Sequence, residues 1–417
     1  MKIYKNLKEK IYLLAKKYSK KAGLDLPYFI KGGFWLSVGQ FFSTLKGFIL
    51  SIVFANFLSK EVFGEYSFIM AVLGIAGIFA LPGMGIAVVQ AVAKGYEGTY
   101  FKALKEVFKW SWLGSLFLLC FSIYEYFFGK FDLCLIFLIL SSLFPFYSIS
   151  GFYPNFFNGK KRFDILVKLS SFFNIISTIL IIMMVLFTKS AFWIAITSIL
   201  IQILVNCYFS IFYVKKFIEN YGVDKNDIEF GKKISYSRAF GGFAGKVDEL
   251  IISYFLGFSD LAIFKIVTLI PDQFKIFMKL LNPMILPKMV SSNISKKDLK
   301  TYFWKFFIVL VFLIAIYVLT APFIFKIFYP KYYKYLWLSI LYHLSFIAYL
   351  NILSSNYLIK EKSRYIIIIE YICNIFTIVS SFIFIYFYGL HGAIYSRMLI
   401  RLFSLLLTTY VFMRYCY

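Results

Sequence analysis

Long apolar runs alternate with short polar segments along almost the whole chain. Twelve runs lie at roughly 33–56, 66–93, 110–128, 133–152, 169–188, 191–214, 239–257, 262–287, 304–326, 336–359, 365–388 and 392–413. A helix needs about 20 apolar residues to cross the hydrocarbon core of a bilayer, and each run has about that length. The runs are continuously apolar, which excludes the alternating strands of an outer-membrane barrel. The pattern predicts an all-α integral membrane protein with about 12 transmembrane helices.

Residues 1–31, before the first run, show a different pattern. They contain nine lysines, and apolar side chains recur at every third or fourth position. This spacing predicts a basic amphipathic helix that lies on the anionic inner leaflet. The segment has no uninterrupted apolar core, so we expect no cleavable signal peptide in it.

Composition supports the membrane assignment. Of the 417 residues, 61% are hydrophobic and 16% are charged, whereas a soluble domain is about 45–50% apolar and about 25% charged. The formal net charge is +25, but the basic residues lie between the apolar runs. Orientation in a membrane therefore explains them better than nucleic-acid binding. The five cysteines form no CxxC or Cys/His cluster, so neither a disulfide, a metal site nor another cofactor site is expected.

The chain repeats itself at an interval of about 200 residues, which is six apolar runs. Phe57-Leu58-Ser59 ends the first run, and Phe255-Leu256-Gly257 ends the seventh. Asn174 to Ser177 in the fifth run matches Asn374 to Thr377 in the eleventh. An even number of helices gives both copies the same orientation, so we expect two parallel six-helix lobes around a central cavity. The predicted parts are an N-terminal segment (1–31), an N-terminal lobe (32–214), a cytoplasmic linker (215–238) and a C-terminal lobe (239–417).

Helix-breaking residues fall in the second run of each lobe. Leu81-Pro82-Gly83-Met84-Gly85 interrupts the first lobe, and Pro271 with Asn282-Pro283 lies in the equivalent run of the second lobe. Broken helices in paired positions are typical of the mobile, substrate-binding part of a transporter. The alternative is that these prolines form inert kinks.

The stretch from Gly33 to Asn56, followed by Phe57-Leu-Ser-Lys-Glu-Val-Phe-Gly64-Glu-Tyr66-Ser67, resembles the polysaccharide (O-antigen type) flippases of the multidrug/oligosaccharidyl-lipid/polysaccharide exporter superfamily. The shared features are a first span that ends in Ala-x-x-Leu, a loop with Phe-Gly-x-Tyr-Ser and a glycine-rich second span. The twelve runs extend the resemblance over nearly the whole chain.

This resemblance implies a transporter, not an enzyme, in a bacterial cytoplasmic (inner) membrane. Its substrate would be a polyprenyl-diphosphate-linked oligosaccharide repeat unit, moved from the inner to the outer leaflet. The resemblance further implies that the first, second, seventh and eighth spans line a cavity whose cationic residues contact the diphosphate. Membrane lipids and the polysaccharide polymerase machinery are the other partners that it suggests.

Charged residues interrupt the apolar runs where a charge is costly. Near the middle of the first, seventh, eighth and twelfth runs lie Lys46, Lys246, Asp248, Glu249, Asp272, Lys275 and Arg401. An ionised side chain at the bilayer centre costs at least about 2.5–3.5 kcal/mol, so such residues mark a pathway or a structural ion pair. A second set lies nearer the ends of the runs, where snorkelling to the interface is the simpler explanation. This set is Glu125, Lys265, Lys279, Glu370 and Arg397.

The cations near mid-membrane predict an anion site. Lys46 and Lys246 lie at almost the same depth in the first span of each lobe, and two facing lysines repel each other unless an anion lies between them. A diphosphate is such an anion; the alternative is that Asp248 or Glu249 already neutralises the lysines. The candidate substrate-binding residues are Lys46, Lys246, Lys275, Lys265 and Arg401. The candidate charge partners, or coupling sites for a proton or sodium ion, are Asp248, Glu249 and Asp272.

Two other functions are alternatives to the flippase. An ion-coupled exporter of small organic cations from the same superfamily would have the same spans, but its cavity should be net acidic. A membrane polysaccharide polymerase would need a substantial outer loop, and every predicted outer loop is about ten residues or less.

The basic residues also predict the orientation of the chain. With the N-terminus in the cytoplasm, cytoplasmic segments hold 32 basic residues and outer segments hold 6. Such an asymmetry is what the positive-inside rule describes. Both termini are therefore expected in the cytoplasm.

We predict that the loop at Lys161 is cytoplasmic and that the turn at Lys189 is outside. In intact cells, a cysteine that replaces Lys161 should stay unlabelled by a membrane-impermeant maleimide, and a cysteine that replaces Lys189 should react. The parent chain with its native cysteines gives the background. Labelling of the Lys161 position from outside would overturn this orientation.

Overall fold

The computed structural model describes residues 26–291 and 296–416, and every regular element in these ranges is a helix. The predicted all-α class is therefore confirmed. Most of the predicted amphipathic segment 1–31 lies outside the described residues, and the first described helix begins at Leu26.

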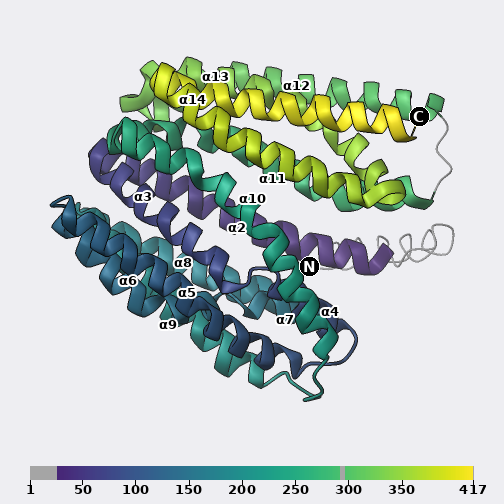
Figure 1. The fold of residues 1–417 in the computed structure, drawn as a ribbon, viewed down its shortest axis with the longest axis horizontal. Helices are drawn as coiled ribbons and strands as arrows, with labels where there is room; N and C mark the ends of the chain where they lie inside the picture. The colour runs from purple at the N-terminus through teal and green to yellow at the C-terminus, as the bar shows by residue number, and fades with distance from the viewer. Residues whose placement is uncertain (1–25, 292–295, 417) are drawn as a thin grey trace, which may run out of the picture.

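The helices form two bundles with three helices between them. The N-terminal half contains α2 (Leu26–Phe57), α3 (Lys60–Ala76), α4 (Met84–Ala93), α5 (Thr99–Phe127), α6 (Phe131–Ser150), α7 (Tyr153–Gly159), α8 (Phe163–Thr188) and α9 (Ala191–Cys207). The C-terminal half contains α10 (Lys225–Phe255), α11 (Phe258–Ser291), α12 (Lys296–Phe328), α13 (Leu336–Leu344) and α14 (Asn351–Cys416). In Figure 1, α5, α6, α8 and α9 form one bundle and α11 to α14 the other, and α2, α3 and α10 run between the bundles.

Eight of the described helical stretches are long and apolar enough to cross a membrane. The other predicted spans differ for identifiable reasons. α10 and α11 have 31 and 34 residues, but both carry several charged side chains. The predicted run 336–359 is divided between α13, a 3₁₀ turn (Ser345–Leu350) and the start of α14.

The long element α14 contains a reversal of the chain at Gly389. This glycine has a φ of +57°, a conformation that L side chains rarely adopt. A straight helix would separate residues 376 and 403 by about 40 Å, yet the rings of Phe376 and Phe403 lie 4.3 Å apart. The predicted runs 365–388 and 392–413 are therefore two arms that pack against each other.

The helix break predicted at Leu81 to Gly85 is confirmed. α3 ends at Ala76, a 3₁₀ turn covers Gly77–Ala80, and α4 begins at Met84. Leu81 has a left-handed φ of 52°. The backbone N–H of Gly83, which lacks a helical partner at the start of α4, donates to Ser235 Oγ at 2.9 Å.

The matching break predicted at Pro271 and Pro283 is wrong, because α11 runs unbroken from Phe258 to Ser291. A proline inside a helix leaves the carbonyl four residues earlier without its N–H donor. That carbonyl belongs to Val267, and it accepts a hydrogen bond of 2.6 Å from Ser339 Oγ on α13. A neighbouring helix thus satisfies the acceptor that Pro271 leaves free, and the helix continues.

The predicted linker 215–238 is only partly a loop. α10 begins at Lys225, so its first fourteen residues fall within this range. Asp224 caps the helix: its carboxylate accepts the backbone N–H groups of Asn226 and Asp227. A capping aspartate at this place satisfies two N–H groups that would otherwise lack partners at the helix start.

α3 and α4 run alongside α10 and the start of α11, and we call this line of contact the seam. A Cβ added to Gly64 would lie 1.7 Å from the carbonyl oxygen of Phe258, and one added to Gly83 would lie 2.6 Å from that of Gly231. A Cβ on Gly74, between these points, would lie 3.5 Å from Lys246 Cε. Small residues therefore let the two halves approach closely at both ends of the seam.

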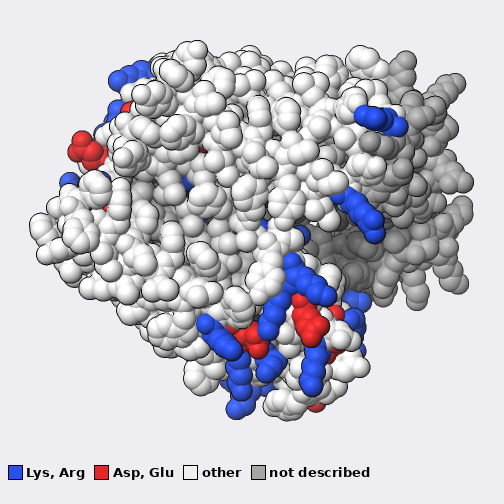
Figure 2. All heavy atoms as spheres, viewed as in Figure 1, with Lys and Arg blue, Asp and Glu red and all other residues white. Residues whose placement is uncertain are grey.

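Ion pairs join the two halves at the predicted cytoplasmic end of the seam. Lys94 Nζ lies 2.8 Å from Asp227 Oδ1 and 3.4 Å from Asp224 Oδ2, and Lys232 Nζ lies 2.7 Å from Glu106 Oε2. The hydrogen bond to Asp227 raises the pKa of Lys94 above its ordinary value. In Figure 2, basic and acidic side chains gather at this lower end of the molecule, whereas most of the visible face above it is uncharged.

Candidate functional site

Charged side chains from four helices lie inside the apolar part of the molecule, and those of α10, α11 and α14 contact one another. The described members are five cations and three carboxylates, namely Lys46, Lys246, Lys265, Arg397, Arg401, Asp248, Glu249 and Asp272. They come from α2, α10, α11 and α14. The side chain of the predicted site residue Lys275 lies outside the described ones. Cations thus outnumber carboxylates by two within this group.

Glu249 is shared by two lysines from different helices. Its Oε1 lies 3.0 Å from Lys246 Nζ on α10, and its Oε2 lies 2.5 Å from Lys265 Nζ on α11. The Glu249 side chain is 5% exposed, whereas the Lys246 side chain is 37% exposed. One carboxylate neutralises one ammonium, so this trio keeps a positive charge, and Lys246 is its most accessible member.

Asp248 faces the interior of the C-terminal half and pairs with Arg397. Its Oδ2 lies 2.5 Å from Arg397 Nε, and its Oδ1 accepts the backbone N–H of Glu249 at 2.9 Å. The Arg397 guanidinium also lies over the Phe264 ring, 4.6 Å from its centre. The interpretation that Arg397 snorkels to the interface is therefore wrong, because its charge is matched inside the protein.

Among the described side chains, the ion-pair partners of Asp272 are two arginines. Its Oδ1 lies 3.0 Å from Arg401 Nη2, and its Oδ2 lies 3.7 Å from Arg397 Nη1. Tyr342 Oη donates to Asp272 Oδ1 at 2.9 Å, and Arg401 Nη1 donates to Ser345 Oγ at 3.0 Å. Arg401, a predicted substrate contact, thus already has a carboxylate and a hydroxyl as partners. Sequence reasoning missed Tyr342 and Ser345, since nothing marks them among the many tyrosines and serines of the apolar runs.

Lys46 differs from the other cations in this group. Its Nζ donates to Ser177 Oγ at 2.6 Å and lies 4.5 Å from the centre of the Phe173 ring. Both partners are on α8, so Lys46 contacts its own half, and its nearest described contacts do not include Lys246. Among the described side chains, no carboxylate lies within ion-pair distance of Lys46. Within the described part of the chain, a hydroxyl and an aromatic face are what stabilise this charge.

The arrangement suits an anion better than a metal ion. Lys246 and Lys265 share one carboxylate, Lys46 pairs with none of the described ones, and lysine is an adequate point-charge partner for phosphate. The described residues contain no group of His, Cys, Asp or Glu side chains that could hold a metal ion.

Many apolar helices of membrane-spanning length identify a multi-pass, all-α membrane protein. Charged side chains inside the apolar part are typical of transporters. The family model described as "Polysaccharide biosynthesis protein" matches residues 29–285. Because this match covers more than half of the chain, the protein belongs to that family. A search of curated protein sequences gave no match.

Solved structures share the fold over nearly the whole chain. "Lipid II flippase MurJ, inward closed conformation" has a TM-score of 0.65 and 18% sequence identity, covering 90% of this chain and 86% of that one. An outward-facing multidrug resistance MATE family transporter of the MOP superfamily has a TM-score of 0.65 and 10% identity, covering 93% and 94%. An inward-facing MATE transporter has a TM-score of 0.58 and 12% identity, covering 92% and 98%. These likenesses establish the fold, including the membrane-spanning helical architecture.

We predict that the Asp248–Arg397 pair is structural. Arg397→Gln leaves a buried carboxylate without its partner, which costs about 3–5 kcal/mol of unfolding free energy. Adding Asp248→Asn should recover much of that loss, because both charges are then absent. Denaturant titration of the purified protein in detergent micelles measures the effect.

Arg162→Gln is the control for this prediction. Arg162 pairs with Asp164 at 3.1 Å, but its side chain is 50% exposed, and exposed pairs contribute at most about 1 kcal/mol. A loss from Arg397→Gln no larger than that of the control would show that the buried pair does not hold the helices together.

Proposed function

We propose that this protein is a flippase for a polyprenyl-diphosphate-linked oligosaccharide. It would move the repeat unit from the inner to the outer leaflet of the bacterial cytoplasmic membrane for surface polysaccharide synthesis, with both termini in the cytoplasm. Membership of the polysaccharide biosynthesis protein family supports this proposal. So does the fold that it shares with a protein titled a lipid II flippase.

The observation that carries the proposal is the surplus of lysine charge inside the membrane region. Lys46 has no described carboxylate partner, and Lys246 and Lys265 share Glu249. A diphosphate carries about two negative charges that must leave water to cross the bilayer, and burying them unpaired is very costly. Lysines that lack full neutralisation offset that cost when the headgroup lies between them.

The seam supplies a way to expose the site to either side. Residues of α3 and α4 pack along α10, and the predicted cytoplasmic end is closed by ion pairs such as Lys94–Asp227. Separation of the halves at one end of the seam at a time would open Lys246 first to the cytoplasm and then to the outside. The polysaccharide polymerase machinery would then receive the flipped substrate.

The alternative function is an ion-coupled small-molecule exporter of the same superfamily. The likeness to multidrug MATE transporters favours it on fold. A site for organic cations should be rich in carboxylates, whereas the described cluster has five cations and three carboxylates. The charge balance therefore favours an anionic substrate.

We predict that Lys46→Ala and Lys246→Ala each abolish export of the lipid-linked sugar while the protein still inserts and accumulates. Lys→Arg at either position should retain a good part of export, because the site depends on charge more than on geometry. Surface polysaccharide in cells that depend on this gene product is the measurement. Lys168→Ala, an exposed lysine on α8, is the control. Normal polysaccharide in both alanine variants would place the anion site elsewhere.

We further propose that Glu249 and Asp272 couple transport to a proton or sodium gradient by exchanging cation partners. Glu249 has two lysines within 3.0 Å, and Asp272 has two arginines within 3.7 Å. Transport into proteoliposomes should then depend on an imposed pH or sodium gradient, and Glu249→Gln should remove that dependence. Transport that is indifferent to every ion gradient would contradict the coupling.

A further inference from the structure

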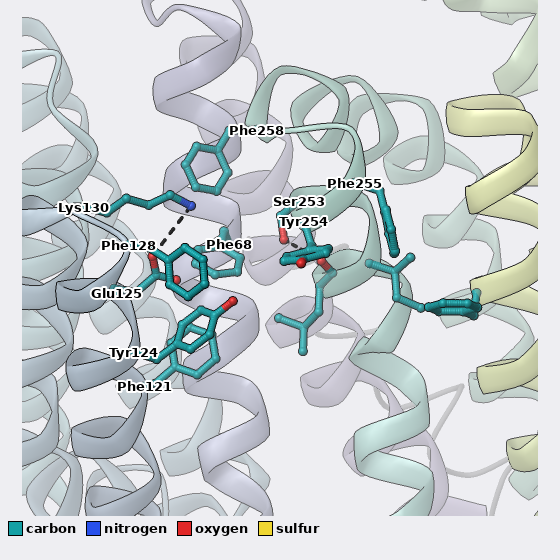
Figure 3. A pocket seen from close by; sticks show the side chains of 13 residues that line it. Phe68, Phe121, Tyr124, Glu125, Phe128, Lys130, Ser253, Tyr254, Phe255 and Phe258 are labelled. Carbon is teal, nitrogen blue, oxygen red and sulfur yellow. Dashed lines mark hydrogen bonds and ion pairs between the residues drawn. The ribbon is translucent and has the colours of Figure 1, made fainter.

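A cavity of about 460 Å³ lies between the two halves at the predicted outer end of the seam, and we call it the aromatic notch. Eight aromatic rings are among the side chains that line it. Phe68, Phe121 and Tyr124 come from the N-terminal half, and Tyr254, Phe255 and Phe382 come from the C-terminal half. Figure 3 shows the rings of α3 and α5 on one side of the notch and those of α10 on the other.

The notch is mostly apolar, with its charge confined to one margin. The Glu125 side chain is 3% exposed and lies 3.7 Å from Lys130 Nζ. The same ammonium lies 5.8 Å from the centre of the Phe258 ring, at the upper edge in Figure 3. The notch is open to the side, since Tyr254 is 72% exposed. It therefore offers an aromatic surface toward the surrounding lipid, bounded by an ion pair.

The notch and the lysine site lie next to each other on the same helix. Leu250, Ser253 and Tyr254 line the notch, and they follow Lys246 by four, seven and eight residues, which places all four on one face of α10. The rise from Lys246 to Tyr254 is about 12 Å. The facing helix α3 also passes from the notch to the lysine site, because Phe68 lines the notch and Gly74 lies against Lys246.

We propose that the aromatic notch binds the first isoprene units of the substrate's prenyl chain while the diphosphate lies at Lys246. This inference rests on the proposed function. A headgroup held inside the protein requires an apolar exit for its chain, because hydrocarbon among charged side chains gains nothing from burial. The notch begins one turn from Lys246, spans both halves and opens toward lipid. A bilayer phospholipid keeps its phosphate at the membrane surface, so the continuity with a lysine inside the membrane region favours the substrate's chain as occupant.

Binding of short ligands to the purified full-length protein tests this proposal. The ligands are inorganic diphosphate and farnesyl diphosphate, which share the anion and differ in the chain. Farnesyl diphosphate should bind the unmodified protein at least about tenfold more tightly, since burial of only two methylene groups already gives about that factor. Ser253→Trp should remove this gain by filling the notch and should leave the affinity for inorganic diphosphate unchanged.

Ser142→Trp is the matched control for the filled notch. Ser142 Oγ donates to the carbonyl three residues earlier at 2.7 Å, as Ser253 Oγ does at 2.8 Å, but Ser142 lies on α6, outside the notch lining. Its variant should keep the full chain-dependent gain. Tyr254→Ser provides a second test that does not add volume, because this ring is 72% exposed. It should reduce the gain several-fold, whereas Tyr126→Ser, at a ring that is 55% exposed and outside the lining, should not.

The outcomes separate the two proposals. If Lys246→Ala leaves the binding of both ligands unchanged, the anion site of the proposed function is wrong. If diphosphate binding depends on Lys246 but the farnesyl gain survives Ser253→Trp and Tyr254→Ser, the prenyl site alone is wrong. A gain that disappears when phosphatidylglycerol is added in excess would also overturn it, since the notch would then be a general lipid groove. A gain that resists phosphatidylglycerol and is lost in both notch variants is the expected result.

Discussion

The cost of an ionised side chain in an apolar helix is the constraint on which the C-terminal half depends. Asp248 on α10 pairs with Arg397 on α14, and Asp272 on α11 pairs with Arg401 on α14. Breaking such a pair leaves a buried charge and costs several kcal/mol, so α10, α11 and α14 are fixed in register by their charges. Lys246 and Glu249 are three residues apart on α10, so fixing this helix also fixes the direction in which both face.

Contacts between the two halves are of a different kind. Along the seam, glycines such as Gly64 and Gly83 allow backbone to approach backbone, and this packing depends on van der Waals contact rather than on charge. The described ion pairs that join the halves, Lys94–Asp227 and Lys232–Glu106, lie at the predicted cytoplasmic end, and their lysine side chains are 51% and 31% exposed. These lysines reach solvent, so they regain water when the halves part at this end.

The sequence was most informative where a property repeats locally along the chain. Continuous apolar runs predicted the helices, and Pro82 with Gly83 predicted the break before α4, because each depends on neighbouring residues only. Pro271 was misleading, since the Ser339 hydroxyl that satisfies the Val267 carbonyl lies far away in the sequence. Arg397 was misjudged for a related reason: its depth near the end of a run suggested snorkelling, while its partner Asp248 is 149 residues away. The charges of Lys46, Lys246 and Glu249 are conspicuous in apolar runs and so are identified from the sequence, whereas the pairing of Glu249 with Lys265 on the next helix requires the fold.

The arginines and the lysines of the charged group differ in how fully their charges are neutralised. The planar guanidinium of arginine makes several directed hydrogen bonds, and Arg397 and Arg401 use theirs on carboxylates and hydroxyls within one half. The charges of these arginines are already neutralised by carboxylates within the protein. Lys46 is held by a hydroxyl and a ring, and Lys246 and Lys265 share one carboxylate. The incompletely neutralised charge therefore lies on α2, α10 and α11, of which α10 and α11 border the seam. A movement of one half against the other would change the surroundings of these lysines without breaking the arginine pairs.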